Sequence, residues 1–294
     1  RRQRQMCIRD SSLVAENGIN ILSMQYDKIQ QVSEDTVLSS YLAPQKEIKA
    51  PRMPEAIIYP FGLNQSQKLA VERALSSKIS IIQGPPGTGK TSVALKSMVE
   101  EFLSDHPQKT LLLMAYTNRA VDEICHTLSA INPAPEYIRI GQELNCAPDF
   151  RPRLMKHVIG DATSRKEIYE KLAPVRVFAG TISSLCSQTE LFSLKVIDVA
   201  IIDEASQVLE PQLLPLLCAT TPVNRGDYNL NRLAIGKFIL IGDHKQLPAV
   251  VSQPREMSRV TEDSLQAIGL TDCRNSLFER LHRLSLSLIH ISEP

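Results

Sequence analysis

The sequence lacks a charge excess, and it lacks any long apolar run. It carries 33 Lys plus Arg against 32 Asp plus Glu, so no overall basic field indicates a nucleic-acid partner. A balanced chain can still carry one basic groove. No apolar stretch approaches the ~20 residues of a membrane-spanning helix, and no signal peptide opens the chain. We therefore expect a cytoplasmic or nuclear protein with no membrane partner. We interpret the start at Arg1 as that of an internal fragment.

The sequence also lacks a cysteine pattern typical of a disulfide framework or a metal site. The six cysteines are scattered with no Cys-x-x-Cys spacing, which argues against disulfides and a zinc site and favours buried or neutral reduced thiols. The six histidines do not cluster either, and we expect three of them at the surface or its boundary: His106, His126 and His157.

The 294 residues allow one or two domains, and 43% hydrophobic content is ordinary for a globular protein. Prolines interrupt residues 44–60, so we assign 1–60 to an N-terminal segment with a Pro-rich linker. Residues 61–284 are expected to form one domain that contains a helical insertion at 141–172. We expect 220–235 to be an exposed loop. The tail 285–294 resembles a strand without a partner, and we treat it as a candidate for non-native sequence.

Strands and helices alternate after Leu63. The continuous apolar run at 110–116 is typical of a strand that is covered on both faces. Alternation of this kind predicts an α/β fold, a mostly parallel sheet with helices on both faces. The expected strands are 79–82, 110–116, 137–140, 175–179, 196–202 and 238–241. The expected helices are 65–75, 91–103, 120–128 and 207–217.

A glycine loop joins the first of these strands to a helix. It matches G-x-x-x-x-G-K-[ST] in full. Its glycines let backbone N–H groups wrap around phosphate oxygens at a helix N-terminus. Lys90 is expected to reach the β- and γ-phosphates and Thr91 to ligate Mg²⁺; the alternative is a simple glycine-rich turn. The predicted ATP-binding residues of the loop are Gly84, Pro85, Pro86, Gly87, Thr88, Gly89, Lys90 and Thr91.

Two acids and an amide follow two later strands. Asp203 and Glu204 end an apolar strand, where ligands bind in open α/β sheets. We expect Asp203 to hold Mg²⁺ and Glu204 to activate the attacking water; alternatively, the acids cap a helix. Gln246, in Gly-Asp-His-Lys-Gln-Leu-Pro, is expected to contact the γ-phosphate, or else it is an ordinary loop glutamine.

Four strings in this order resemble motifs Q, I, II and III of superfamily 1 helicases. They are Leu63-Asn64-Gln65-Ser66-Gln67, the glycine loop, Asp203-Glu204-Ala205-Ser206, and residues 242–248. Within that superfamily the chain is similar to the branch of the nonsense-mediated-decay helicase and its bacterial relatives, and the string 276–281 supports this. The resemblance covers residues 61–284. It implies a RecA-like P-loop NTPase domain whose ATP hydrolysis drives movement along single-stranded DNA or RNA.

The resemblance also implies further contacts. Gln67 matches the glutamine that reads adenine; otherwise it is a helix-surface residue. Thr117, Asn118 and Thr181 match positions that touch the nucleic-acid backbone, where hydroxyl and amide donors suit phosphates. For these three residues the alternative is helix capping or a strand-end turn.

The chain departs from the family after motif III. Motifs IV, V and VI are missing, so we expect the second RecA-like domain, a partner in cis, and its arginine finger to be missing too. Arg274, Arg280 and Arg283 do not replace the finger by position. We expect this fragment to bind ATP–Mg²⁺ and hydrolyse it weakly, as a finger is worth about 10³–10⁵ in rate. Another class of P-loop NTPase, or an ATP-gated binding module, stays open, as does the oligomeric state.

Overall fold

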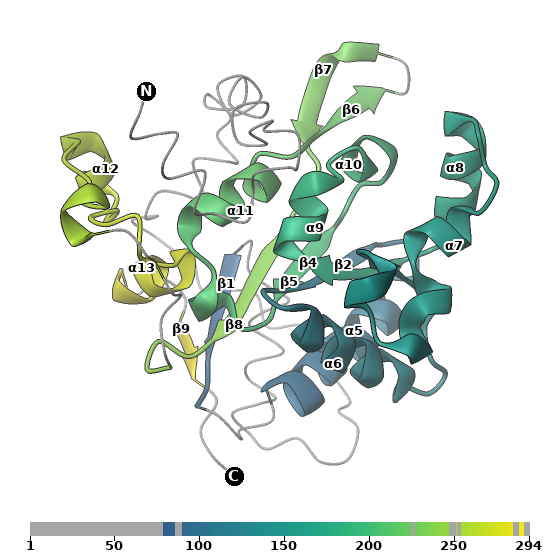
Figure 1. The fold of residues 1–294 in the computed structure, drawn as a ribbon, viewed down its shortest axis with the longest axis horizontal. Coiled ribbons are helices and arrows are strands. Elements are labelled where there is room, and N and C mark those ends of the chain that lie inside the picture. Colours follow the sequence, from purple (N-terminus) through teal and green to yellow (C-terminus); the bar gives the residue numbers. More distant parts are fainter. Residues whose placement is uncertain are drawn as a thin grey trace.

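The structure, a computed structural model, describes residues 79–85, 90–224, 227–246, 251, 254–284 and 288–290. A seven-stranded sheet runs through them in the order β3-β4-β2-β5-β8-β1-β9 (Figure 1). All neighbouring strands in this sheet are parallel. The carboxyl ends of the strands therefore share one edge, which we call the carboxyl edge. The strands are β1 (Ile79–Gln83), β2 (Leu111–Ala115), β3 (Tyr137–Ile140), β4 (Val177–Thr181), β5 (Val199–Ile202), β8 (Phe238–Gly242) and β9 (Leu288–His290).

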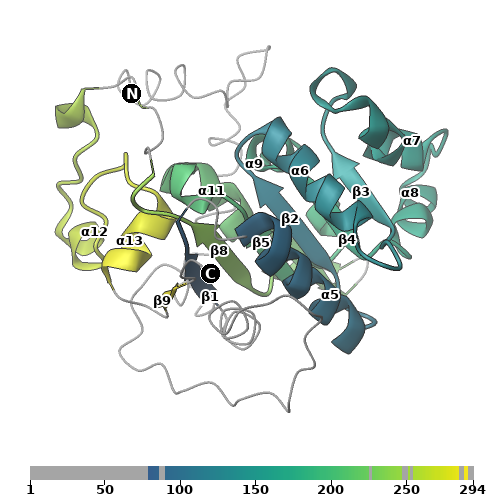
Figure 2. The same cartoon turned by 90° about the horizontal axis from the view of Figure 1, so that it is seen from below.

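Helices cover both faces of the sheet (Figures 1 and 2). One face carries η1 (Lys90–Leu95), α5 (Lys96–Asp105) and α6 (Asn118–Ser129). The other carries α9 (Ile182–Ser187), α10 (Leu191–Leu194), α11 (Glu210–Leu217) and α13 (Leu277–Arg283). The predicted α/β fold is confirmed by this arrangement.

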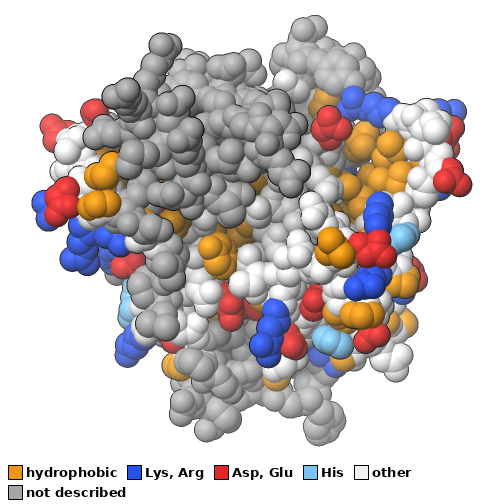
Figure 3. Space-filling model, viewed as in Figure 1, with side chains coloured by type: hydrophobic (Ala, Val, Ile, Leu, Met, Phe, Trp, Pro, Cys, Tyr) orange, Lys and Arg blue, Asp and Glu red, His pale blue; other side chains and the backbone are white. Residues whose placement is uncertain are grey.

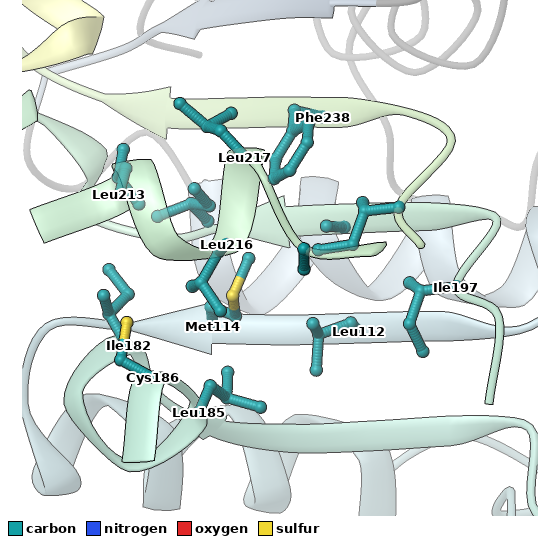
Figure 4. Packing of buried hydrophobic residues seen from close by; sticks show 14 of the residues in the cluster. Leu112, Met114, Ile182, Leu185, Cys186, Ile197, Leu213, Leu216, Leu217 and Phe238 are labelled. Atoms are coloured by element: carbon teal, nitrogen blue, oxygen red, sulfur yellow. The ribbon is translucent and has the colours of Figure 1, made fainter. Parts of the chain in front are cut away.

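The central strand β2 shows why its sequence is apolar throughout. Leu112 and Met114 pack into the core beneath α9 and α11, which Figure 4 shows from close by. Leu111, Leu113 and Ala115 pack into the core on the α5 and α6 side. Every residue of β2 is buried, so its sequence shows no alternation of apolar and polar residues.

Short helices lie between β3 and β4. They are η2 (Glu143–Asn145), η3 (Pro148–Arg153), α7 (Met155–Ile159) and α8 (Arg165–Leu172). A capping box starts α8: Ser164 Oγ accepts the Glu167 N–H, and the Glu167 carboxylate accepts the Ser164 N–H. Further short elements are η4 (Ala205–Gln207), η5 (Arg255–Met257) and α12 (Asp263–Ala267).

The prediction of an exposed loop at 220–235 was wrong. Strands β6 (Thr220–Asn224) and β7 (Asp227–Leu233) form an antiparallel pair, which projects beside α10 in Figure 1. In the sequence of β7, Tyr228 and Leu230 alternate with polar residues, and Arg225-Gly226 stands between the two strands. The polar residues of this segment made the strand pattern resemble a loop. In the tail, expected to lack a partner, Leu288–His290 pair with β1.

Several expectations concern other properties of the chain. Cys125, Cys146, Cys186 and Cys218 are buried free thiols, whereas Cys273 is exposed. Burial raises the pKa of Cys186 to about 12, so this thiol stays neutral. No helix among the described residues is long and apolar enough to cross a bilayer. The helix expected at 65–75 lies outside the described residues.

Candidate functional site

Three of the motif strings meet at one end of the carboxyl edge. Strands β1, β8 and β5 are neighbours in the sheet, and each is followed by one of the strings. Gly84, the first residue of the glycine loop, donates its N–H to the Gly242 carbonyl at 3.1 Å. Segments separated by about half of the chain are therefore bonded directly to one another. We call this part of the edge the nucleotide end.

A buried glutamine joins the glycine loop to the motif III string. Gln83, the last residue of β1, donates from Nε2 to Asp243 Oδ1 at 2.6 Å. The His244 N–H donates to Gln83 Oε1 at 3.2 Å. Gln83 and Asp243 are only 4% and 3% exposed. Sequence reasoning missed Gln83, although a polar residue at the end of an apolar strand before the glycine loop was a usable signal.

A serine joins the motif II and motif III strings. The Asp243 N–H donates to Ser206 Oγ at 3.3 Å. A Cβ on Gly242 would lie 3.0 Å from Ser206 N, so the glycine permits this close approach of the two segments. Ser206 was likewise not predicted as a site residue. Through Gln83, Asp243 and Ser206, the three strings form one hydrogen-bonded unit.

The acidic pair has an unusual backbone. Glu204 has a φ of 52°. Among the described residues, no other non-glycine residue has a positive φ. This left-handed conformation costs about 1–2 kcal/mol. Asp203 is buried, and its Oδ1 accepts the Glu204 N–H at 3.0 Å. Glu204 stands at the N-cap position of η4 but makes no side-chain cap bond. Helix capping therefore does not explain why a glutamate occupies this position.

The remaining nucleotide residues are described unevenly. The Gln246 N–H donates to the Asp243 carbonyl at 3.2 Å, which closes a turn over residues 243–246. Pro85 is exposed. The backbone of Lys90 and Thr91 begins η1, a π-helix that continues into α5, while their side chains are not described. Outside the described residues lie Gln67, Pro86, Gly87, Thr88 and Gly89.

The donor set at Asp203 fits a magnesium ion. Mg²⁺ prefers oxygen ligands and usually takes one or two carboxylates beside substrate phosphates and water. Asp203 supplies such a carboxylate at the end of β5, with β8 between this strand and β1, which the glycine loop follows. No cluster of three or more His, Cys, Asp or Glu that could hold a metal occurs among the described residues.

The three arginines considered as substitutes for the finger are engaged elsewhere. Arg280 is 1% exposed and donates from Nε and Nη2 to the two carboxylate oxygens of Glu210, at 2.8 and 2.6 Å. Arg274 donates to the Val251 carbonyl, and Arg283 pairs with Glu279 on α13. The bidentate pair fixes α13 to α11 and keeps Arg280 away from solvent.

The predicted nucleic-acid residues gather at the other end of the edge, where β2, β4 and β3 finish. Thr117, Asn118 and Thr181 line one cavity of about 590 Å³. Thr117 Oγ1 accepts the Ala120 N–H at 3.1 Å, and Thr181 Oγ1 accepts the Ser184 N–H at 3.1 Å. Both threonines thus cap helices. We call this part the cavity end.

A buried arginine shapes the cavity end. Arg139, fully buried on β3, donates to Asp122 Oδ1 at 3.0 Å and to Asn118 Oδ1 at 3.2 Å. A Cβ on Gly141 would lie 2.8 Å from Arg139 Nη1, so this glycine makes room for the guanidinium. Arg139 fixes Asn118 and was also missed. Its signal was a lone charge inside an apolar strand.

A parallel sheet with a glycine loop after one strand and an acidic pair after a nearby strand defines a RecA-like P-loop NTPase domain. Residues 62–173 and 160–254 match the protein family described as an AAA domain, and the chain belongs to that family. Together with the motif strings, this supports the resemblance to superfamily 1 helicases.

Curated relatives carry helicase names. The chain is 29% identical over 296 residues to the DNA replication ATP-dependent helicase/nuclease JHS1 of Arabidopsis thaliana, covering 95% of this chain and 19% of that protein. It is 29% identical over 237 residues to the DNA replication ATP-dependent helicase/nuclease DNA2 of Mus musculus, covering 79% and 19%. It is 26% identical over 273 residues to the DNA polymerase alpha-associated DNA helicase A of Saccharomyces cerevisiae, covering 76% and 36%.

Among solved structures, the Pif1 helicase of Candida albicans aligns with a TM-score of 0.40 at 17% identity, covering 80% of this chain and 40% of that one. The chain spans between 19% and 36% of the length of the curated relatives named above.

Proposed function

We propose that the chain is the first RecA-like motor domain of a superfamily 1 helicase, which couples ATP hydrolysis to translocation on single-stranded nucleic acid. The observation that carries this proposal is the hydrogen-bonded unit of Gln83, Asp243 and Ser206. It joins the glycine loop, the acidic pair and the motif III loop, so a change at the γ-phosphate can pass between them. An isolated nucleotide-binding site would not need that link.

In this proposal each predicted side chain has one role. Lys90 contacts the β- and γ-phosphates, while Thr91 and Asp203 hold Mg²⁺, which neutralises phosphate charge when bound. Glu204 orients the attacking water and takes its proton. Gln246 distinguishes ATP from ADP, and Gln67 reads adenine. The left-handed backbone of Glu204 supports its role, because strained residues cluster at functional sites.

We infer the substrate from the names of the relatives and the partner domain from the contacts of the arginines. The three curated relatives carry DNA in their names, which favours single-stranded DNA over RNA. A second RecA-like domain in cis would supply the arginine finger, since the described candidate arginines are bonded elsewhere. The narrower placement beside the nonsense-mediated-decay helicase stays a prediction. So do the domain limits and a cytoplasmic or nuclear location.

Calorimetry with ATP–Mg²⁺ tests the nucleotide site. Lys90→Ala should lower ATP affinity by about tenfold, because a charge-assisted phosphate contact is removed. Lys96→Ala is the matched control, since Lys96 lies on the following helix and pairs with Glu100 at 3.8 Å. Equal ATP affinity in Lys90→Ala and Lys96→Ala would contradict the site.

ATP turnover of the complete protein, measured with single-stranded DNA and RNA side by side, separates the alternatives. Stimulation by either strand supports a motor. A P-loop NTPase of another class would show turnover without stimulation. An ATP-gated binding module would show ATP-dependent strand affinity without turnover.

A further inference from the structure

Two adjoining cavities lie at the amino edge of the sheet, opposite the carboxyl edge. Their volumes are about 630 and 370 Å³, and they share Val196, Asp198 and Arg232. Val196 precedes β5 and Lys237 precedes β8, which places the cavities where these strands begin. Figure 3 shows hydrophobic side chains in a hollow between α8 and the β6–β7 pair, with basic atoms beside it. We call the two cavities together the amino-edge groove.

The amino-edge groove is basic although the whole chain has a net charge of only +1. Asp198 is the one carboxylate among the lining residues, and its Oδ2 accepts the Thr110 N–H at 2.9 Å. Burial lowers the pKa of Lys237 to about 8, and the nearby charge of Lys109 contributes to a smaller degree. The lining cations are Lys109, Arg165, Lys166, Lys195, Arg232 and Lys237.

The floor of the groove is apolar and partly aromatic. Tyr169, Leu194, Pro222 and Val223 line the larger cavity, and Val223 is 41% exposed. Strand-binding grooves combine cations that track phosphates with apolar or aromatic surfaces that take base faces. The cations here are spread over both cavities rather than gathered at one point. That distribution suits a ligand with repeated negative charge.

We propose that the amino-edge groove binds the phosphate backbone of a nucleic-acid strand, at a place separate from the cavity end. The assignment of the ligand as nucleic acid, and not another polyanion, rests on the proposed function. The presence of a basic groove does not depend on that function. The five residues of β8 span about 17 Å between the two edges. The strand is either a continuation of the one at the carboxyl edge or a second strand of a fork.

Charge reversal in the groove tests the proposal. Lys109→Glu/Arg232→Glu changes two exposed cations. Lys109 lines the smaller cavity, and Arg232 lines both. The matched control is Arg255→Glu/Arg259→Glu, two exposed arginines outside the groove. Strand affinity is measured by fluorescence anisotropy at several salt concentrations on a strand of about 30 nucleotides. Circular dichroism confirms that both variants fold.

We expect affinity to fall by about tenfold in the groove variant, and the slope of log K against log salt to shrink by about 2. The control should keep both values. A forked substrate run in parallel distinguishes the sources: weakening on strand and fork alike indicates one continuous strand, and weakening on the fork alone indicates a second strand.

Two results would overturn the groove. One is unchanged affinity and slope on both substrates. The other is equal competition by a polyglutamate peptide of matched charge, which would assign the groove to acidic proteins. If Asn118→Ala weakens strand binding while the groove variant does not, the proposed function stands and only the groove fails. If the unmutated chain binds neither the strand nor the fork, the groove and the proposed function both fail.

Discussion

At the nucleotide end of the carboxyl edge, polar side chains reach across strands, whereas at the cavity end they bond mostly near their own helices. Gln83 and Asp243 lie 160 residues apart and are bonded at 2.6 Å. Thr117 and Thr181 each accept an N–H from three residues ahead. The first arrangement depends on strand order, and the second on local capping. Substitutions at the two ends should therefore fail in different ways.

The largest effect is expected at Glu204. In the full-length parent protein, Glu204→Gln should lower ATP turnover by about 10²–10⁴ because the amide cannot take the proton of the attacking water. ATP affinity should stay within about twofold, since the change is isosteric. Steady-state turnover and calorimetry measure the two quantities. Glu256→Gln, an exposed acid on η5, is the control. Unchanged turnover in Glu204→Gln would remove this residue as the base.

The buried ion pair behind the nucleotide end gives the next effect, on stability. Arg280→Ala should lower the free energy of unfolding by about 3–5 kcal/mol, because the Glu210 carboxylate is left buried without its partner. Arg280→Met with Glu210→Leu should recover most of the loss. Arg283→Ala, which breaks an exposed pair, should cost about 0.5 kcal/mol or less. Urea unfolding distinguishes these outcomes.

A smaller effect is expected for the link between Gln83 and Asp243. Gln83→Leu removes a buried donor to Asp243 and should cost about 1–3 kcal/mol of stability. A double-mutant cycle with Asp243→Asn should give a coupling energy of at least about 0.5 kcal/mol. Additive losses would mean that the side chains act independently, and the contrast between the two ends would then disappear.

The meeting of three motif strings at one end of the sheet was predictable because parallel strands place their carboxyl ends together. Once Gly84, Asp203 and Gln246 were assigned to strand ends, their meeting followed from topology. The links through Gln83, Ser206 and Arg139 were not predictable in the same way. The links through Gln83 and Ser206 depend on which strands are neighbours, and the link through Arg139 depends on how α6 lies against β3. The sequence gives neither arrangement. The β6–β7 pair was missed for a different reason, because its polar residues resemble a loop.

The smallest effect separates capping from strand binding at the cavity end. Thr117→Ala should cost about 1 kcal/mol through the lost cap of α6, and Thr117→Ser should restore it. Because Thr117 is exposed and lines the cavity, Thr117→Ala should also weaken strand binding a few-fold, by about 1 kcal/mol.

Thr181 is the matched comparison, because it caps α9 through the same kind of bond but is 4% exposed. Its alanine variant should lose stability to a similar degree and show the smaller change in strand affinity. If both threonine variants lower stability and neither changes strand affinity, these hydroxyls serve the helices alone. The contact with nucleic acid at this end would then fall to Asn118, which Arg139 fixes from beneath.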